Sequence, residues 1–416
     1  MKPRRVAITG LGLISPYGGD ATDFFARLCA GESAVRYLLT DDRPRPVSMP
    51  FVCCPDFDAN AALGRPLAIL MDRFCQLATA AAFQAWDDAG FHRARNDEDR
   101  DRWGCSWGSS LGGALAIEKA YREMWLNGRE RLPPSSVVMG MHNSANAHIS
   151  IQLGLGGIST SHAAACASAN IAIGEAFHRV RSGEAVVMLT GGSDTPQAYG
   201  VARAWEALRV IAPASADHAA RACRPFASDR AGLVLGEGAA ALVLEDWEHA
   251  EARGATIHAE IVGYGTSCDH DHLVRPSAAG QVRALHAALA DGGLDAREVD
   301  YINAHGTATA EGDPTEIEAL NTVFGPHAPA LAVSSTKSMH GHLLGAAGAI
   351  EAFATVQALS AQCAPPTAHL DDRLDPTCAG VEHLTSASSR PLRAALSNSF
   401  AFGGSNAVLA FRAATA

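Results

Sequence analysis

The stretch Ile158-Ser-Thr-Ser-His-Ala-Ala164 predicts a β-strand, and the residues that follow it decide the fold class. A helical run extends from about Ala167 to Arg181 and is stopped by Gly183, and a second buried strand, Ala185-Val-Val-Met-Leu189, comes next. A strand, a helix and another strand joined by short connections are typical of a layered α/β fold.

The same alternation extends outward over the rest of the chain. Toward the N-terminus it predicts strands at 6–14 and 103–109 and helices at 20–30 and 70–90. Toward the C-terminus it predicts a strand-pair region at 233–244, strands at 257–264, 299–304, 331–335, 392–397 and 407–411, and helices at 281–290, 314–323 and 343–359. The charged segment 248–256 separates two parts with the same order of elements, although no sequence repeat is evident. We therefore expect two halves, 1–250 and 251–416, that share one packed body because no low-complexity linker divides them.

Composition excludes several classes of protein. Of the 416 residues, 48% are hydrophobic and 19% are charged, which indicates a globular chain with a large core rather than a disordered one. The net charge of −11 argues against nucleic-acid binding over a broad surface, since such surfaces are usually basic. An acidic partner would therefore have to dock on a local basic patch.

Cysteine usage and the N-terminus bear on the compartment. The ten cysteines include no Cys-x-x-Cys pair and resemble neither a disulfide framework nor a zinc site, so we expect a reducing cytoplasm. The start of the chain, two arginines followed by the apolar run 6–14, is interpreted as a buried first strand rather than a signal peptide, because no small-residue cleavage site follows. No apolar stretch approaches the roughly 20 residues of a membrane span.

Four short segments contain residues suited to chemistry. Cys166 lies between a predicted strand and a helix, where the helix N-terminus is expected to lower the pKa of its thiol, although a small buried cysteine is the alternative. His305 follows a predicted strand, a place where α/β folds bind ligands, although a hydrogen-bonded core histidine fits as well. Lys337, one of three lysines among 33 basic residues, and His342 lie between a strand and a helix. The fourth segment, Asn398-Ser-Phe-Ala-Phe-Gly-Gly-Ser-Asn406, predicts either a flexible loop with exposed amides or a simple hairpin turn.

Two other motifs are interpreted as structural. Gly10-Leu-Gly12 is part of a dinucleotide-binding pattern, but Ser15 and Pro16 stand where a third glycine and a helix would begin. Cys268-Asp-His-Asp-His272 contains metal-binding residue types, but its spacing fits no usual zinc site, and a polar loop is favoured.

The four segments together, in this order, form a specific constellation. Cys166, His-Gly-Thr at 305–307, Lys-Ser-Met-His-Gly-His at 337–342 and Asn-Ser-Phe-Ala-Phe-Gly-Gly at 398–404 resemble the β-ketoacyl-acyl carrier protein synthases over nearly the whole chain. The likeness is greatest to the elongating synthase II type and the bacterial type II polyketide ketosynthases. It implies the thiolase fold, with two similar α/β halves in a five-layered αβαβα sandwich, usually dimeric.

The resemblance also implies roles for the reacting residues. Cys166 would accept an acyl chain from the phosphopantetheine arm of acyl carrier protein, and malonyl-carrier protein would then lose CO₂ and attack the acyl group. His305 and His342 match the two active-site histidines, whose Nε2–H groups would stabilise the enolate. The amides of Cys166 and Phe402 would form the oxyanion hole. Lys337 would belong to the same machinery, and no metal or redox cofactor would be needed.

Further residues match supporting positions of that family. Lys337 and Glu351 resemble a charged pair that orients the two histidines, and Thr307 and Phe400 belong to the flanking motifs. Leu111 matches a position at the floor of the acyl pocket. Phe402 matches the residue that gates access of malonyl substrate to the acyl group.

The chain departs from the family pattern at three places. Ala401 stands where glycine is usual, so gating would differ, and the nucleophile region reads Ala-Ala-Cys-Ala-Ser-Ala. The stretch 66–70 is apolar where basic residues are common. The candidates that remain for docking an acidic carrier protein are Arg65, Arg73, Arg129, Arg131 and Arg209. These departures favour a specialised polyketide or polyene pathway over housekeeping fatty-acid elongation.

Two other functions fit part of the constellation. A chain-length-factor-type partner subunit of a ketosynthase heterodimer typically lacks the nucleophilic cysteine, which this chain retains. A Cys-His hydrolase or simple acyltransferase needs no second histidine, lysine or gating loop. Initiating synthases use Cys, His and Asn, so the presence of both His305 and His342 favours an elongating enzyme, as a homodimer or a heterodimer.

Overall fold

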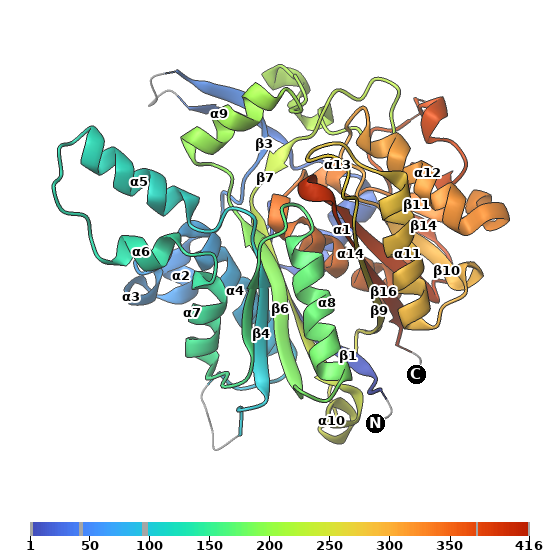
Figure 1. Cartoon of the computed structure of the whole chain (residues 1–416), viewed down its shortest axis with the longest axis horizontal. Coiled ribbons are helices and arrows are strands. Elements are labelled where there is room, and N and C mark those ends of the chain that lie inside the picture. Colours follow the sequence, from blue (N-terminus) through green and yellow to red (C-terminus); the bar gives the residue numbers. More distant parts are fainter. Residues whose placement is uncertain (1–2, 41–44, 94–98, 372, 415–416) are drawn as a thin grey trace.

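The computed structural model of the chain describes residues 3–40, 45–93, 99–371 and 373–414. Its central feature is an eleven-stranded mixed sheet formed by two groups of strands (Figure 1). In spatial order the first group is β5 (Ser159–His162), β4 (Trp103–Gly108), β6 (Val187–Asp194), β8 (Gly238–Asp246) and β1 (Val6–Ile14). The second is β9 (Ala259–Cys268), β16 (Ser405–Ala413), β15 (Ala394–Phe400), β10 (Val299–Asn303), β11 (Ala332–Ser334) and β13 (Glu382–His383). The two groups join where residues 6–8 of β1 pair with residues 259–261 of β9.

The two groups of strands repeat one topology. In the first, β4 runs parallel to β5 and β6, while β8 is antiparallel to both β6 and β1. In the second, β10 runs parallel to β11 and β15, while β16 is antiparallel to both β15 and β9. The same order and directions recur without a visible sequence repeat, so the prediction of two similar halves is confirmed. The boundary at residue 250 stays a prediction.

Helices complete five layers. Helices α4 (Arg73–Asp88) and α7 (Ser144–Leu153) cover the outer face of the first group of strands, and α11 (Ala278–Gly292) and α12 (Gly312–Phe324) lie on the outer side of the second. Between the two groups lie α8 (Ser168–Arg181) and α14 (Ala347–Ala361), each of which packs against strands of both. The layers are therefore α, β, α, β, α, as expected.

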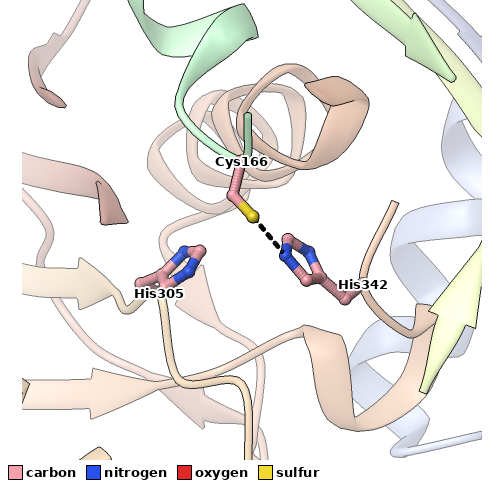
Figure 2. A group of neighbouring side chains, drawn as sticks. All are labelled: Cys166, His305 and His342. Carbon is pink, nitrogen blue, oxygen red and sulfur yellow. Dashed lines mark hydrogen bonds between the residues drawn. The ribbon is translucent and has the colours of Figure 1, made fainter. Parts of the chain in front are cut away.

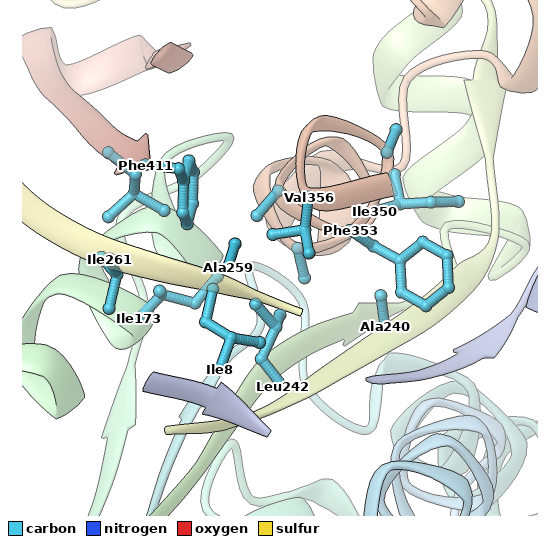
Figure 3. Close-up of a cluster of buried hydrophobic side chains, with 14 of the residues drawn as sticks. Ile8, Ile173, Ala240, Leu242, Ala259, Ile261, Ile350, Phe353, Val356 and Phe411 are labelled. Carbon is cyan, nitrogen blue, oxygen red and sulfur yellow. The ribbon is translucent and has the colours of Figure 1, made fainter. Parts of the chain in front are cut away.

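The middle layer contains the main hydrophobic core. Figure 3 shows Ile8 and Leu242 of the first group of strands packed with Ile261 of the second and with Ile350 and Phe353 of α14. Among the described residues, the helical stretch Leu344–Ala361 is long and apolar enough to cross a membrane by length and composition, which corrects the expectation that no such stretch exists. However, 83% of it is buried inside the protein, as is usual for a core helix.

Local signals explain several element boundaries. Helix α1 (Ala21–Ala30) begins where the side chain of Asp20 accepts a hydrogen bond from the amide of Asp23, and it ends at Gly31, which adopts φ 69°. Helix α4 begins three residues later than predicted because the carboxylate of Asp72 caps it through the amide of Phe74.

The glycines of the Gly10-Leu-Gly12 motif have a packing role. A Cβ on either residue would overlap a backbone carbonyl oxygen of α4, that of Ala85 for Gly10 and that of Ala81 for Gly12. The motif therefore lets α4 pack closely on β1, which accounts for both glycines without a dinucleotide.

Several elements were not predicted from the sequence. They are the strands β2 (Arg36–Thr40) and β3 (Val47–Val52), which form a small sheet with β7 (Leu235–Gly236) of the predicted strand-pair region, and the helices α5 (Ala114–Trp125), α6 (Ser135–Gly140), α7 and α9 (Tyr199–Leu208). Helices α5 and α6 contain no buried residue, and α9 buries only Ala202. These three helices therefore add little to the core.

Candidate active site

A sharp turn between β5 and α8 presents Cys166. Ala165, immediately before the cysteine, adopts φ 47°, which is unusual for a residue other than glycine. The hydroxyl of Ser168 accepts a hydrogen bond from the amide of Ala164 at 2.9 Å and donates one to the carbonyl of Ala165 at 2.7 Å. These bonds hold the turn at the start of α8, so the thiol projects from the end of the helix.

Two histidines from the second half converge on this thiol. The Nε2 atom of His342 lies 2.9 Å from the Sγ atom of Cys166, and Figure 2 shows His305 on the other side of the sulfur. The two imidazole rings are almost perpendicular, with centroids 5.4 Å apart. His305 lies two residues after the end of β10, while His342 is fixed to the β7 region through its backbone, whose amide donates to the carbonyl of Val234 at 2.6 Å. Three distant segments of the chain therefore meet at one buried point.

The electrostatics of this group correct one sequence prediction. Burial raises the pKa of the Cys166 thiol to about 12, although the charge of Lys337 acts in the opposite direction. The predicted lowering by the helix N-terminus was wrong, because loss of hydration disfavours the thiolate more strongly than the helix end favours it. Burial, followed by the charge of Lys337, holds the pKa values of His305 and His342 well below the ordinary 6.5. At neutral pH the group is a thiol with two neutral imidazoles.

Lys337 and Glu351 form a buried ion pair behind the histidines. Both side chains are fully buried, Lys337 at the start of α13 (Lys337–His340) and Glu351 in α14. Burial raises the pKa of Glu351 to about 7, against the effect of the neighbouring Lys337. The pairing expected from the sequence is present.

A carboxylate outside the sequence motifs fixes the His305 loop. The side chain of Glu316, on α12, accepts hydrogen bonds from the amides of His305 and Gly306, both at 2.8 Å, and from the side-chain amide of Asn398 at 3.0 Å. No spacing in the sequence distinguishes this buried glutamate from the other acidic residues of the chain.

A second such carboxylate, Asp194, lies at the end of β6. It is buried, and it accepts hydrogen bonds from the Ser109 hydroxyl and from the backbone amides of Ser110, Leu111 and Gly345. It therefore connects the loop after β4 with the turn that follows His342.

The segment 398–406 is the hairpin between β15 and β16, so the simpler of the two interpretations is correct. Its turn is the short helix at Phe402–Gly404, where Gly403 and Gly404 adopt φ 84° and 77°. Ala401 adopts φ −114°, an ordinary extended conformation, so its Cβ is accommodated without strain.

Aromatic and hydroxyl side chains of the predicted set surround the histidines. The Phe400 ring lies 6.1 Å from the His305 ring, and the Phe402 ring stacks on Trp205 at a centroid distance of 5.9 Å. The hydroxyl of Thr307 lies 3.0 Å from that of Thr309.

These side chains line a cavity of about 570 Å³ that reaches the cysteine. Its lining includes Cys166, Trp205, Arg209, His305, Thr307, His342, Phe400 and Phe402. Leu111 is not part of this lining. It packs instead against a separate buried cluster that contains Leu235 and Leu344.

The predicted docking arginines divide into two groups. Arg65, Arg129, Arg131 and Arg209 are exposed, and Arg129 also pairs with Glu123 at 2.9 Å. Arg73 does not fit a docking role, because its guanidinium makes two hydrogen bonds to the buried carboxylate of Glu237, at 2.7 and 2.8 Å. The positive charge of Arg73 therefore compensates the buried carboxylate of Glu237.

Cys166, His305 and His342 are also a possible donor set for a metal ion, with ligand atoms within 4.8 Å of one another. A thiolate and two imidazoles suit zinc. The raised pKa of the thiol opposes metal binding, since the ligand must be deprotonated.

Family models match both halves of the chain. The β-ketoacyl synthase N-terminal domain matches residues 3–250, and the β-ketoacyl synthase C-terminal domain matches residues 258–371. The chain belongs to the β-ketoacyl synthase family.

Curated relatives span the full length of the chain. Nodulation protein E of Rhizobium sp. (strain N33) is 45% identical over 412 residues, which cover 98% of this chain and 99% of the relative. The 3-oxoacyl-[acyl-carrier-protein] synthase 2 of Staphylococcus aureus (strain N315) is 39% identical over 412 residues, 98% of both chains. The chain is accordingly a β-ketoacyl-acyl carrier protein synthase.

Solved structures agree on the fold. A β-ketoacyl synthase from Burkholderia phymatum STM815 has a TM-score of 0.90 at 36% identity, and the ishigamide ketosynthase/chain length factor has 0.90 at 32%; each match covers 99% of this chain and 100% of the other. A ketosynthase described in complex with its type II polyketide acyl-carrier protein has 0.89 at 29%, with 100% of both chains covered. The synthase therefore has the predicted thiolase fold.

Proposed function

We propose that this synthase elongates a chain by decarboxylative Claisen condensation, with the growing acyl group held on Cys166. The observation that carries the proposal is the convergence of Cys166, His305 and His342 in one buried cavity, with Sγ 2.9 Å from the Nε2 of His342. A nucleophile beside an imidazole suits acyl transfer, and a second imidazole suits an additional step in which negative charge develops.

In the first step, the sulfur of Cys166 attacks the thioester carbonyl of an acyl-carrier protein. The thiol proton passes through His342, the nearest acceptor, to the departing phosphopantetheine sulfur. A new C–S bond forms as the old one breaks, so the step is balanced. The backbone amides of Cys166 and Phe402 are proposed to stabilise the oxyanion of the tetrahedral intermediate.

In the second step, malonyl-carrier protein occupies the cavity beside the acyl group. The bond to its carboxylate breaks, CO₂ leaves, and the electron pair forms an enolate on the thioester. Nε2–H groups of the neutral His305 and His342 would donate to the enolate oxygen; for this, His342, which accepts the thiol proton at Nε2 in the first step, has to change from its Nδ1–H to its Nε2–H tautomer before malonyl substrate enters. The enolate carbon then attacks the acyl carbonyl, and the sulfur of Cys166 departs as a thiolate and takes one proton from solvent, which balances the step.

Lys337 and Glu351 are proposed to support the histidines rather than touch substrate. The charge of Lys337 lowers the pKa values of both His305 and His342, which keeps them neutral. Thr307 and Phe400 complete the wall beside His305. Leu111 is proposed to limit the acyl chain from the opposite side of Cys166, outside the 570 Å³ cavity.

We further propose a specialised polyketide or polyene chain as the product. The apolar stretch at 66–70 and Ala401 support this choice, as does the likeness to a ketosynthase structure named for a type II polyketide system. The enzyme would work as a homodimer or with a chain-length-factor-like subunit. The presence of Cys166 and both histidines argues against its being the chain-length factor itself.

Acyl carrier protein is the proposed partner, docked through Arg65, Arg129, Arg131 and Arg209. No cofactor and no resident metal are proposed, because the phosphopantetheine arm brings both substrates. We place the reaction in the reducing cytoplasm, which the ten unpaired cysteines of the described structure support.

Mass spectrometry tests the proposal. The protein is incubated with acyl-carrier proteins of several chain lengths and then with malonyl-carrier protein, beside Cys166→Ala. An acyl adduct on Cys166 that disappears on malonyl addition, with a β-keto product two carbons longer, is the expected result. No adduct with any primer, including after addition of candidate partner subunits, would overturn it.

A further inference from the structure

Cys166, His305 and His342 have the geometry of a three-ligand metal site. Their ligand atoms lie within 4.8 Å of one another, all three side chains are buried, and all three line the 570 Å³ cavity. Figure 2 shows the two imidazole rings on either side of the sulfur. Three protein ligands with a fourth position open to water are the usual arrangement of zinc at a reactive site.

The types of donor atom select the class of ion. A thiolate and two imidazoles suit Zn²⁺, whereas Mg²⁺ and Ca²⁺ prefer oxygen ligands. The neutral imidazoles of His305 and His342 already have the form that binds a cation, so binding displaces one proton only, from the Cys166 thiol. The raised pKa of that thiol lowers the affinity for zinc but leaves the arrangement of the three ligands unchanged.

Buried carboxyl groups near the ligands favour a bound cation. Asp194 and Glu351 are buried close enough for their charges to act on the Cys166 sulfur, against the charge of Lys337. Glu316, also buried, accepts a hydrogen bond from the backbone amide of the ligand His305. Three carboxyl groups and one ammonium therefore lie around the three ligands, and this surplus of acidic groups attracts a divalent cation.

The surroundings of the histidines indicate a reversibly bound ion rather than a resident cofactor. In most metal sites the second ring nitrogen of a ligand histidine donates to a carboxylate, carbonyl or water, which fixes the ring. Within the described part of the chain, the Nδ1 atoms of His305 and His342 have no hydrogen-bond partner. The distance of 2.9 Å between Sγ of Cys166 and Nε2 of His342 must also widen to about 3.6 Å to fit tetrahedral zinc, with its Zn–S and Zn–N bonds of about 2.3 and 2.1 Å. Both features lower the affinity.

We propose that Zn²⁺ binds to Cys166, His305 and His342 and reversibly inhibits the synthase before it is acylated. One Zn–S and two Zn–N bonds form, the thiol proton leaves to solvent, and water completes the coordination; no electron is transferred. Acylation is blocked, because the electron pair of the sulfur is bound to zinc and His342 can no longer accept a proton. Once Cys166 carries an acyl group its sulfur is no longer a thiolate ligand, so the acyl-enzyme resists zinc. The inhibition rests on the proposed function, whereas the binding does not.

Titration of the full-length protein with Co²⁺, a coloured substitute for zinc, tests the binding. We expect a thiolate-to-cobalt charge-transfer band and the visible bands of tetrahedral cobalt, which added Zn²⁺ should abolish. Cys166→Ser should remove the charge-transfer band. His342→Gln should weaken Co²⁺ binding by at least about tenfold, since even the loss of an outer partner of a ligand costs that much.

The matched control for binding is Cys268→Ser. Cys268 is exposed and belongs to Cys268-Asp-His-Asp-His272, the other segment of the chain with metal-binding residue types. This variant should keep both sets of cobalt bands. A charge-transfer band that survives in Cys166→Ser, or one that disappears in Cys268→Ser, would overturn the inference.

Single-turnover mass spectrometry of Cys166 acylation measures the inhibition. At a free Zn²⁺ concentration ten times the dissociation constant, acylation should slow about elevenfold, because only the metal-free fraction reacts. EDTA should restore the rate, and Mg²⁺ at the same concentration should leave it unchanged. Enzyme acylated before zinc is added should condense with malonyl-carrier protein at the uninhibited rate.

The two proposals fail in different ways. Equal rates of Cys166 acylation with and without zinc would overturn the inhibition. A protein that shows the cobalt bands but forms no acyl adduct with any primer, in the absence of metal, would instead overturn the proposed function.

Discussion

The Nε2 atom of His342 lies 2.9 Å from the sulfur of Cys166, and both groups are neutral at pH 7. Burial raises the thiol pKa to about 12 and lowers that of the imidazole, so the same desolvation suppresses charge on both partners. The free enzyme therefore holds a latent nucleophile. Proton transfer becomes favourable when a thioester supplies a group that takes up the negative charge.

Alkylation of Cys166 by iodoacetamide should accelerate about tenfold per pH unit from pH 7 to pH 9, because the thiolate fraction rises tenfold per unit far below the pKa. An ordinary thiol, with a pKa of about 8.5, levels off near the end of that range. Peptide mass spectrometry measures the rate at Cys166, with the exposed Cys268 as an internal reference for reagent stability. A plateau for Cys166 below pH 8 would contradict the raised pKa.

Protonation of His305 and His342 should contribute no change in malonyl decarboxylation between pH 7 and 5.5; the group of the site that titrates in this range is Glu351, whose pKa burial raises to about 7. A histidine of ordinary pKa 6.5 would be about 90% protonated at pH 5.5, whereas His305 and His342, with lowered pKa values, lose their neutral forms only at more acidic pH. The initial rate of CO₂ release at saturating malonyl-carrier protein measures this, with thermal unfolding monitored at each pH. An inflection near pH 6.5 would show that burial does not perturb these groups as described.

Substitution of one member of the Lys337–Glu351 pair should destabilise the fold. Lys337→Met leaves Glu351 as an uncompensated buried acid, and removing one partner of a buried pair costs about 3–5 kcal/mol. Urea unfolding measures the free energy. The double variant with Glu351→Leu should recover much of the loss, and a single variant as stable as wild type would contradict the prediction.

The Lys337→Met substitution should also raise the pKa values of His305 and His342. Because the charge of Lys337 lowers the pKa values of His305 and His342, its removal should shift the acid limb of decarboxylation toward pH 6.5. A double variant that recovers stability but keeps the shifted acid limb would separate this electrostatic effect from folding.

Arg209 and Arg73 should respond differently to loss of charge. Arg209→Gln should raise KM for carrier protein, most clearly at low salt, and leave stability unchanged, since Arg209 is exposed at the cavity. Arg73→Gln should instead destabilise the fold by about 1–3 kcal/mol, because it leaves the buried Glu237 without its cation. Steady-state kinetics and urea unfolding on both variants check the contrast, and reversed effects would refute it.

The sequence predicted what local chemistry determines. The ends of α1 follow from Asp20 and Gly31, and the positions of Cys166, His305 and His342 between strands and helices are evident from periodicity and from the family motifs. The sequence did not reveal contacts between residues that are far apart in the chain. Nothing near Arg73 in the chain reveals Glu237, 164 residues away, and the helix N-terminus at Cys166 says nothing of the burial that reverses the expected pKa shift.

Helices α5 and α9 were also missed. Their apolar residues are spaced as in an amphipathic helix, but these helices bury at most one residue and lie outside the main core. Trp205 therefore went unnoticed until the fold placed it beside Phe402.

Asp194→Asn should weaken the connection between the two halves of the site. The carboxylate accepts hydrogen bonds from Ser110 and Leu111 on one side and from Gly345 on the other, and an asparagine offers one oxygen and one NH₂ group to the same donors. Donors left unpaired in a buried site cost about 1–3 kcal/mol, so the free energy of unfolding should fall by about that amount.

The rate of Cys166 acylation should also change in Asp194→Asn. Gly345 follows His342 by three residues, and Leu111 lies in the loop that Asp194 connects to it. We expect slower acylation and an altered preference among primer lengths, measured by single-turnover mass spectrometry. Asp20→Asn is the matched control, since asparagine caps a helix as well as aspartate does. If Asp194→Asn lost stability while its primer preference matched that of wild type, Asp194 would stabilise the fold without positioning the active-site residues.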